Sequence, residues 1–320
     1  MRTITQTHTG KIISDTDLNL EYLYVGDYGK ENNIKADFLG YTKRIDKVEH
    51  KDVDITDKLV VTVSSQKGCP MDCDFCDCPK FGFHSNCTEM ELLSEITTGI
   101  ALSGIKHGKR LNIHFARMGE PTFNPDVIKA AVKIITMVES GNTVCFDEYH
   151  PVVSTMMPKG NNKLEDFLQK WVRWGKTYGG EDGFGLQFSI NTLDEEERNK
   201  MFRNHSLSLW EIGDIISRLP APKKRKYTLN FAVTSKSNLD PALMDKYFDK
   251  EKCIVKITPI HETHEAVSQG YEIVKKFDVY ERFERPLVEA GWQVIVFIPS
   301  EEEDSDRITC GNSLIAKASK

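Results

Sequence analysis

The sequence predicts an α/β fold in which a largely parallel sheet is covered by helices. Two observations lead to this class. From about residue 59 onward, short runs of β-branched and apolar residues alternate with segments of helical spacing. The chain has 320 residues, enough for one large α/β domain or two domains of ordinary size. Repeated alternation is typical of a parallel sheet, closed as a barrel or left open, and either form carries its site at the carboxyl ends of the strands.

Seven strands are expected in the alternating part of the chain. Each is a short run of β-branched and apolar residues with a helical or turn-forming segment after it. In chain order they are LVVTVS (59–64), LNIHFA (111–116), PVVSTM (151–156), GLQFSI (185–190), YTLNFAVT (227–234), CIVKITPI (253–260) and QVIVFIPS (293–300).

Helices are expected between these strands. Thr88 and Glu91 form a capping box, in which the hydroxyl and the carboxylate satisfy free backbone N–H groups at a helix start. Pro125 suits the first turn of a second helix, and VIKAAVKIITMV after it has helical spacing. Further helices are predicted near 162–174, 194–218, 240–249 and 279–290.

The first 58 residues differ from the rest of the chain. They are polar and punctuated by Gly, Asn and Asp, with short strand signals at LEYLYV (20–25) and ADFLGYT (36–42). We interpret residues 1–58 as a small β-rich amino-terminal extension.

Composition limits the partners and the compartment. The net charge of −6 and the pI of about 5.9 give no whole-molecule attraction to nucleic acid, so any contact with RNA must be local. The most basic stretch, Lys223 to Lys226, is interpreted as a solvated turn before a strand. We find neither an apolar run of about 18 residues nor a signal-peptide pattern at the start, so a cytoplasmic protein without a membrane partner is expected.

Four of the eight cysteines lie within SSQKGCPMDCDFCDC (64–78), and Cys69, Cys73 and Cys76 have the spacing C-x-x-x-C-x-x-C. Cytoplasmic thiols are kept reduced, which favours metal binding or chemistry over disulfides. Three thiolates can ligate three irons of a 4Fe-4S cluster and leave the fourth iron open. The alternative is a zinc-stabilised binding module without catalysis, with Cys78 or Cys87 as fourth ligand, although the sequence has no second C-x-x-C or H-x-x-x-H motif.

This spacing after a first strand resembles the radical S-adenosylmethionine superfamily. The resemblance implies a partial (β/α)6 barrel over 59–300 and a carboxyl-terminal arm at 301–320. It also implies that S-adenosylmethionine binds the open iron and is cleaved, after receiving one electron, to a 5′-deoxyadenosyl radical. The protein positions this cofactor and keeps the radical from water. An electron-donor protein such as flavodoxin or ferredoxin would be the reductant.

Further motifs resemble one subgroup, the radical enzymes that methylate adenine in ribosomal and transfer RNA. In family order they are Gly82-Phe83, MGEP (118–121), Ser154-Thr155 and Cys310-Gly311. The resemblance implies that Gly119 and Glu120 meet the methionine amino group, for which a carboxylate is a strong acceptor. Ser154 and Ser189 would contact cofactor oxygens, and His261 stands where the family carries asparagine. Without the resemblance, MGEP could be a turn and the serines buried residues satisfied by backbone.

The resemblance implies that Cys310 carries the methyl group. A first S-adenosylmethionine methylates its thiolate, and a second supplies the radical that removes hydrogen from the S-methyl group. The resulting carbon radical adds to the adenine ring. The polar run EEEDSDRITCGNS fits a mobile carrier arm, although by itself Cys310 would be an ordinary cysteine near a chain end.

One position departs from the subgroup. Thr62 stands seven residues before Cys69, where the family has a second catalytic cysteine that takes a ring proton and then forms a disulfide with the carrier. A threonine hydroxyl is a poor base near neutral pH and forms no disulfide. Cys78, absent from the usual family pattern, is the candidate replacement.

The implied substrate is an adenine, or a related base, of RNA. The segment before Cys69 is shorter than usual for the family, and the acidic pI suggests a smaller or different substrate, since Lys and Arg contacts supply much of RNA affinity. A second interpretation keeps the radical chemistry but changes the outcome, on a nucleotide, small molecule or peptide. Phe81, Phe83 or Trp210 could hold an unstacked base, or could be core residues.

Overall fold

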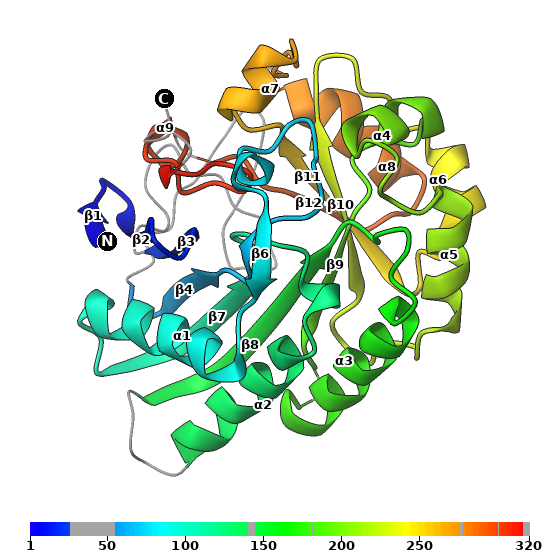
Figure 1. The fold of residues 1–320 in the computed structure, drawn as a ribbon. Coiled ribbons are helices and arrows are strands. Elements are labelled where there is room, and N and C mark those ends of the chain that lie inside the picture. Colours follow the sequence, from blue (N-terminus) through cyan, green and yellow to red (C-terminus); the bar gives the residue numbers. More distant parts are fainter. Residues whose placement is uncertain (26–54, 140–144, 181, 275–277, 300, 316–320) are drawn as a thin grey trace.

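One sheet of ten strands runs through the molecule in the order β1-β2-β3-β4-β7-β8-β9-β10-β11-β12 (Figure 1). The structure is a computed structural model that describes residues 1–25, 55–139, 145–180, 182–274, 278–299 and 301–315. The strands are β1 Arg2–Gln6, β2 Gly10–Asp15, β3 Leu20–Val25, β4 Lys58–Val63, β7 His107–Phe115, β8 Cys145–Thr155, β9 Gly185–Ser189, β10 Tyr227–Val233, β11 Cys253–Pro259 and β12 Val294–Val296. A separate hairpin pairs β5 Gln66–Gly68 with β6 Phe83–Asn86.

From β4 to β12 the main sheet is parallel, and each strand pairs with the next one in chain order. Its two edges are β1 and β12, so the sheet stays open. The helices are α1 Glu89–Ser103, α2 Asp126–Glu139, α3 Leu164–Tyr178, α4 Glu195–Met201, α5 Leu209–Arg218, α6 Pro241–Tyr247, α7 His264–Ser268, α8 Arg285–Glu289 and α9 Glu301–Ser305, with short helical turns η2 Cys78–Phe81, η3 Pro121–Phe123 and η4 Tyr280–Glu284. Helices α1 to α6 lie around the outer side of the sheet, whereas α7 and α9 lie at the top of the view (Figure 1).

Side chains alternate between the two faces of the sheet along each strand, so one face borders the apolar core and the other borders an interior cavity. On β7, Leu111 and Ile113 are fully buried in the main apolar core. The residues that follow each of them, Asn112 and His114, point the other way and line a cavity on the inner side of the sheet. Because successive strand side chains face opposite sides, one set packs against the helices while the other forms the interior wall.

The amino-terminal strands extend the same sheet. β1, β2 and β3 are antiparallel, and β3 pairs with β4 so that Leu23 lies opposite Thr62. LEYLYV is β3, as predicted, whereas ADFLGYT lies outside the described residues. The division into an extension, a barrel over 59–300 and an arm remains a prediction.

Local sequence signals account for most helix starts, and one predicted helix is wrong. The capping box at Thr88 and Glu91 is present. The single helix predicted over 194–218 is instead two helices, because Arg203 and Asn204 adopt positive φ angles of 44° and 60° between them. A second capping box at Ser208 then starts α5, and the spacing S-x-x-E that marks it is visible in the sequence.

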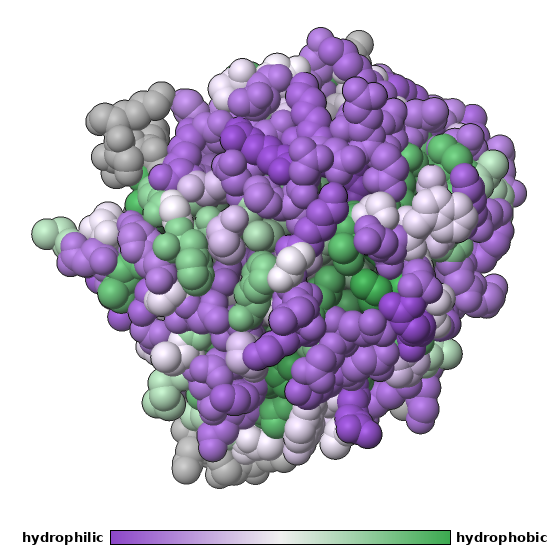
Figure 2. All heavy atoms as spheres, turned by 45° about the vertical axis from the view of Figure 1, so that its right-hand side comes forward, coloured by the Kyte–Doolittle hydropathy of each residue, from purple (hydrophilic) through white to green (hydrophobic). Residues whose placement is uncertain are grey.

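The face in Figure 2 is mainly hydrophilic, with apolar residues gathered in small patches. This matches the mean hydropathy of −0.41. Among the described helices, none has both the length and the apolar character needed to cross a membrane.

Candidate active site

The cysteine loop lies beyond the carboxyl end of β4, between the two strands of the β5–β6 hairpin. The backbone N–H of Cys69 donates to the carbonyl of Gly82 at 2.9 Å, which closes the base of the loop. The N–H of Cys76 donates to the carbonyl of Cys73 at 3.2 Å, which forms a turn between the last two cysteines. The loop therefore occupies the end of the sheet where a site was predicted.

The three thiols lie close enough to influence one another. Burial raises the pKa of Cys69 to about 12 and that of Cys73 well above its ordinary value, and repulsion from Cys76 adds to both shifts. Cys69 and Cys73 pack against an apolar cluster that includes Met71 and Met156. In the part of the chain that the structure describes, no three His, Cys, Asp or Glu side chains surround a common metal position. Two of the three thiols therefore pack against one apolar cluster, and in the described structure the three are not arranged around a metal position.

Glu120 lies beside this loop and is only 3% exposed. Its carboxylate accepts hydrogen bonds from the backbone N–H groups of Thr122 at 3.1 Å and Met156 at 3.0 Å. Burial raises the pKa of Glu120, and its charge contributes to the raised pKa of Cys69 and Cys73. A buried carboxylate therefore lies near the cysteine loop, and its contact with the cofactor remains a prediction.

Gly119 brings the MGEP turn against the loop. Its φ is +89°, and a Cβ atom at this position would lie 2.5 Å from the Cβ of Gln66, so the close approach requires glycine. The N–H of Glu120 donates to the Gln66 side chain at 2.8 Å. A hydrogen bond from the N–H of Gly119 also stabilises the thiolate form of Cys69. MGEP is therefore a packed turn beside the loop, and its contact with the cofactor remains a prediction.

The other predicted cofactor residues lie at the carboxyl ends of neighbouring strands. The Ser154 hydroxyl donates to Gln187 at 3.4 Å, and Ser189 ends β9 and lines the interior cavity. His261 follows β11 and lines the same cavity, with its Nδ1 atom 3.0 Å from Asp304 of α9. The structure brings these side chains to one end of the sheet, and their contacts with the cofactor remain predictions.

The segment carrying Cys310 is docked against the cysteine loop. The backbone N–H of Asp77 donates to the carbonyl of Gly311 at 2.8 Å. A Cβ atom on Gly311 would lie 3.8 Å from the Cα of Cys76. The Cys310 thiol lies 3.9 Å from the carbonyl oxygen of Ala116. Cys310 is an exposed residue, but desolvation around its sulfur raises the pKa of the thiol and repulsion from Cys76 adds to the shift, so the thiol and the loop influence each other.

A buried ion pair holds this segment in place. Arg117 is 4% exposed, and its Nε atom donates to a carboxylate oxygen of the fully buried Glu21 at 2.9 Å. The Arg117 guanidinium also donates to the carbonyls of residues 307–309 at 2.8 to 3.3 Å. The second Glu21 oxygen accepts from the N–H groups of residues 314 and 315 at 3.0 and 3.2 Å. The ion pair therefore forms hydrogen bonds with the arm on both sides of Cys310, at residues 307–309 and at residues 314 and 315.

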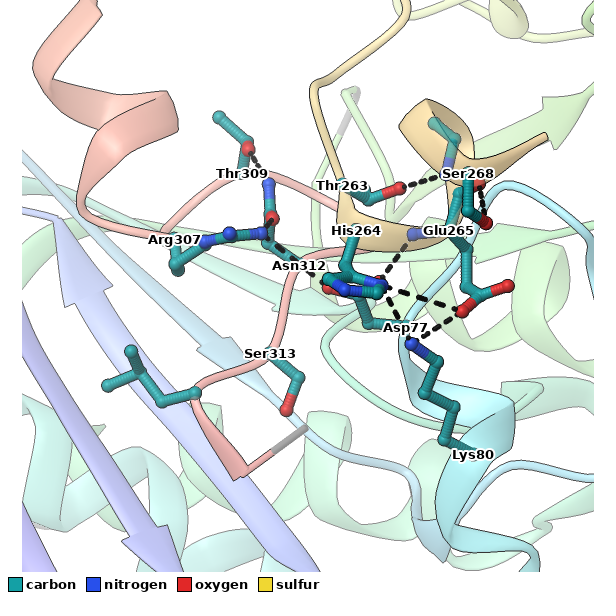
Figure 3. Close-up of polar contacts among 12 residues, drawn as sticks. Asp77, Lys80, Thr263, His264, Glu265, Ser268, Arg307, Thr309, Asn312 and Ser313 are labelled. Atoms are coloured by element: carbon teal, nitrogen blue, oxygen red, sulfur yellow. Dashed lines mark hydrogen bonds and ion pairs between the residues drawn. The ribbon is translucent and has the colours of Figure 1, made fainter. Parts of the chain in front are cut away.

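Asp77 links the cysteine loop to α7 and to the arm (Figure 3). One carboxylate oxygen accepts from the N–H of Glu265 at 3.0 Å, and the other lies 3.7 Å from the Arg307 guanidinium. Lys80 reaches across to Glu265 at 2.5 Å and to the Nδ1 atom of His264 at 3.1 Å. These contacts hold the cysteine loop against α7 and against the arm.

Thr62 and Cys78 occupy different sides of the site. Thr62 lines the interior cavity, as does Cys310. Cys78 is buried, and its thiol lies 3.5 Å from the carbonyl oxygen of Arg117. It also forms a hydrogen bond with Cys76, which lowers the pKa of Cys76. The replacement role of Cys78 remains a prediction, and its thiol lies next to a predicted cluster ligand.

Two of the aromatic residues considered for base stacking are exposed, so the alternative that they are core residues is wrong. Phe83, on β6 beside the cysteine loop, is 48% exposed. Trp210, on helix α5, is 56% exposed. Its ring packs edge-on against that of Tyr247 on α6, with 5.1 Å between the ring centroids. Phe81 is half-buried. Only the Phe81 and Phe83 region lies near the cysteine loop.

The interior cavity has a volume of about 1370 Å³ and extends along the inner face of the sheet. Its walls reach from Cys310 to Lys58 and Arg110 at the amino ends of β4 and β7. Arg225, from the basic stretch interpreted as a solvated turn, also lines it, and one of its guanidinium nitrogens is completely buried. For Arg225, the solvated-turn interpretation is therefore wrong.

Sequence reasoning missed Glu21, Arg117 and Asp304. The two members of the Arg117 pair are 96 residues apart, and Asp304 is 43 residues from His261. No local spacing connects such partners. The available signal was the position of Arg117, directly before MGEP.

The structure combines a partial barrel of parallel strands with a three-cysteine loop after its first parallel strand, the arrangement expected from the resemblance to radical S-adenosylmethionine enzymes. Curated relatives confirm this predicted relationship. The chain is 27% identical over 206 residues to the dual-specificity RNA methyltransferase RlmN of Nautilia profundicola, a match covering 60% of this chain and 52% of that protein. It is 25% identical over 189 residues to the protein of the same name from Sorangium cellulosum, covering 58% and 44% of the two chains. The chain therefore spans about half the length of the curated relatives it matches.

A solved structure with the same fold is a radical SAM methyltransferase from Sphaerobacter thermophilus. Its TM-score is 0.66 at 18% identity, and the match covers 98% of this chain and 81% of that one. At this identity the likeness establishes the fold alone, and it confirms the predicted partial barrel. No protein-family model matches the sequence.

Proposed function

We propose that this chain uses a 4Fe-4S cluster and S-adenosylmethionine to methylate an adenine, or a related base, of RNA through a methylated Cys310. The contact between the two cysteine-bearing segments carries this proposal. The N–H of Asp77 donates to the carbonyl of Gly311 at 2.8 Å. A carrier thiol must lie beside the radical source when hydrogen is removed from its methyl group, and this contact supports that proximity.

Cys69, Cys73 and Cys76 would hold the cluster. Cys69 and Cys73 pack against the same apolar cluster, and burial together with repulsion from Cys76 raises the pKa of both thiols. Such a donor set fits a group that binds thiolates and compensates their charge. Glu120 would accept hydrogen bonds from the cofactor amino group, close to Gly119, and Ser154, Ser189 and His261 would contact other cofactor atoms. When bound, the cluster and S-adenosylmethionine supply a 5′-deoxyadenosyl radical.

Cys310 would act as the methyl carrier. Its thiolate forms a bond to the methyl carbon of one S-adenosylmethionine as the sulfonium C–S bond breaks, and S-adenosylhomocysteine leaves. The charges of Lys256 and Arg117 favour this thiolate and partly offset the burial that raises the pKa of Cys310. Once a hydrogen atom has been removed from the S-methyl group, its carbon adds to the adenine ring. The base is then linked covalently to Cys310.

Product release would use Cys78, because Thr62 cannot supply a thiol. The ring of the adduct would give up one electron, for which the bound cluster would be the acceptor, and one proton, which would pass to solvent. The Cys78 thiolate then attacks the Cys310 sulfur and forms a disulfide as the S–C bond to the base breaks. The electron pair of that bond stays on the methyl carbon, which takes up a proton. An external dithiol reduces the disulfide and restores both thiols.

The choice of RNA rests on the names of the relatives, which describe RNA methyltransferases. A net charge of −6 means that docking would depend on local contacts. An electron-donor protein such as flavodoxin or ferredoxin would reduce the cluster, and the thiol chemistry requires a reducing compartment such as the cytoplasm. Thr62 favours a second candidate, a different radical outcome on a nucleotide, small molecule or peptide.

Mass spectrometry of the Cys310 peptide tests the proposal. The reconstituted chain is incubated anaerobically with S-adenosylmethionine whose methyl group carries deuterium. We expect one labelled methyl group on Cys310 and, after reduction of the cluster, deuterium in 5′-deoxyadenosine. The variant Cys310→Ala should form unlabelled 5′-deoxyadenosine. If the wild-type chain forms only unlabelled 5′-deoxyadenosine and leaves Cys310 unmethylated, methyl transfer is excluded and the second candidate is favoured.

A further inference from the structure

Cations converge on the inner face of the sheet, away from the cysteine loop. Lys58 begins β4, Arg110 lies early in β7, Arg225 precedes β10 and Lys256 lies in the middle of β11. All four line the interior cavity. Burial, and then the positive charges of these four side chains, lower the pKa of His114 to about 3. Their shared effect on one imidazole means that they surround a single region of the interior.

Basic side chains outnumber acidic ones on the described wall of the cavity. Among the described residues that line the cavity, lysines and arginines outnumber aspartates and glutamates by eight to three. Glu148 lies 4.0 Å from Arg110 and 2.9 Å from His150, but its side chain is 59% exposed. Asp182, which attracts Arg225, is exposed to solvent as well. Water therefore screens the charges of these two acids, and it weakens their attraction for Arg110 and Arg225.

Three buried polar atoms on this wall have no hydrogen-bond partner among the described residues: Nδ1 of His150, Nη1 of Arg225 and Oδ1 of Asn230. Arg225 also forms no ion pair within that part of the chain. The Arg225 guanidinium packs over Gly185. A Cβ atom on Gly185 would lie only 2.6 Å from Nη2 of Arg225. A buried guanidinium without an acceptor is unfavourable, and buried polar groups are normally satisfied. These atoms point to a ligand that offers acceptors to Arg225 and a donor to Asn230.

We propose that this basic wall binds a small phosphate ester, such as a nucleoside phosphate. A phosphate carries about two negative charges and three oxygens, which match several cations and the fork of a guanidinium better than one carboxylate does. A sugar hydroxyl or base N–H would donate to Asn230. The assignment rests on Arg225 and Asn230, which the methyl-transfer mechanism does not use, so it can fail or succeed independently of that mechanism.

The cavity is large enough to hold such a ligand together with part of a second molecule. A typical single-ligand site has a volume of roughly 300 to 1000 Å³, whereas this cavity has about 1370 Å³. Lys58 and Thr62 are four residues apart on β4, which corresponds to about 13 Å along a strand. A ligand anchored by its phosphate near Lys58 would extend toward the end of the cavity where Cys310 lies. That geometry suits a substrate or an effector held inside the barrel.

Isothermal titration calorimetry of the reconstituted full chain at low ionic strength tests the assignment. The probes are adenosine 5′-monophosphate, inorganic pyrophosphate and adenosine. We expect the two phosphate compounds to bind and adenosine to bind far more weakly. Arg225→Gln should weaken the binding of the phosphate compounds by about tenfold or more, because a charge-assisted contact is lost, whereas Arg225→Lys should retain part of the affinity.

The matched control is Lys223→Gln, which removes a charge from the same basic stretch at an exposed residue outside the cavity wall. It should leave the affinity within about twofold of the wild type, as expected for a screened surface charge. Arg225→Gln should also raise the unfolding temperature of the ligand-free chain, because it removes an unpaired buried charge. Three results would overturn the proposal. The two variants could lose the same amount of affinity, or adenosine could bind as tightly as the phosphate compounds. The chain could also bind an RNA oligonucleotide but neither small phosphate.

Discussion

The backbone N–H of Asp77 donates a 2.8 Å hydrogen bond to the carbonyl of Gly311, and this contact joins the two cysteine-bearing segments of the chain. Asp77 directly follows the third cysteine of the loop, and Gly311 directly follows the predicted carrier. A backbone hydrogen bond sets the register between them without depending on side-chain identity. The arm is therefore docked in the described arrangement, and its predicted mobility would require this bond to break.

The Arg117 and Glu21 pair should control that docking. We predict that Glu21→Gln lowers the free energy of unfolding by about 3 kcal/mol, because it leaves a buried guanidinium without its counter-charge. Hydrogen exchange of residues 307–315 should rise at the same time. The control is Asp166→Asn, which breaks an exposed pair with Lys170 and should cost about 0.5 kcal/mol or less. Unchanged exchange of the arm in Glu21→Gln would show that the pair does not hold it.

The cysteine loop should bind an iron-sulfur cluster. After anaerobic reconstitution we expect broad absorbance near about 400 nm, which a zinc site would not give. Changing Cys69, Cys73 or Cys76 to Ala should abolish it, since each removes one of three thiolates. Cys78→Ala should retain it. Loss of absorbance in the Cys78 variant alone would instead assign Cys78 as a ligand.

Cys78→Ala should trap a covalent adduct between Cys310 and the substrate. The variant keeps the predicted cluster ligands and the carrier but lacks the thiol proposed to resolve the adduct. Mass spectrometry of the protein after turnover should show the base attached to Cys310, and the double variant with Cys310→Ala should show none. Normal multiple turnover by Cys78→Ala would eliminate this role. Cys87→Ala, another buried cysteine, serves as the control and should not trap an adduct.

Features specified by local spacing could be predicted from the sequence. The strands follow from short apolar runs, and the start of α1 follows from the Thr88 capping box, which the structure contains. The position of the cysteine loop follows from the strand before it. In each case the interaction that fixes the element lies within a few residues, so the pattern and the cause coincide.

The remainder depends on partners distant in the sequence. Glu21 contacts residues 314 and 315 almost 300 residues later, and no periodicity reports such a contact. Arg225 was interpreted as solvated because three other basic residues surround it, yet its guanidinium turns inward over Gly185. Tertiary packing decides the direction of a long side chain, and composition alone carries no information about it.

A buried acid far from any proposed catalytic role should make stability depend on pH. Glu95 of α1 is 2% exposed, and its carboxylate accepts from the N–H of Ser64 at 2.8 Å. Burial raises its pKa well above the ordinary value. The folded chain therefore retains a proton on Glu95 at pH values where the unfolded chain, with a pKa of about 4.3, has lost it.

The sign of the effect follows from this difference. The folded state binds more protons between the two pKa values, so the Glu95 contribution is complete below about pH 4.3 and is lost as the pH rises, by up to about 1.4 kcal/mol per pH unit. Glu95→Gln keeps an acceptor for Ser64 but cannot ionise. Urea unfolding at pH 6 and pH 8 should show a smaller loss of stability for Glu95→Gln than for the wild type. Glu251→Gln, which alters an exposed carboxylate, should follow the wild type. Parallel pH profiles for Glu95→Gln and the wild type would mean that Glu95 is ionised in the folded chain despite its burial.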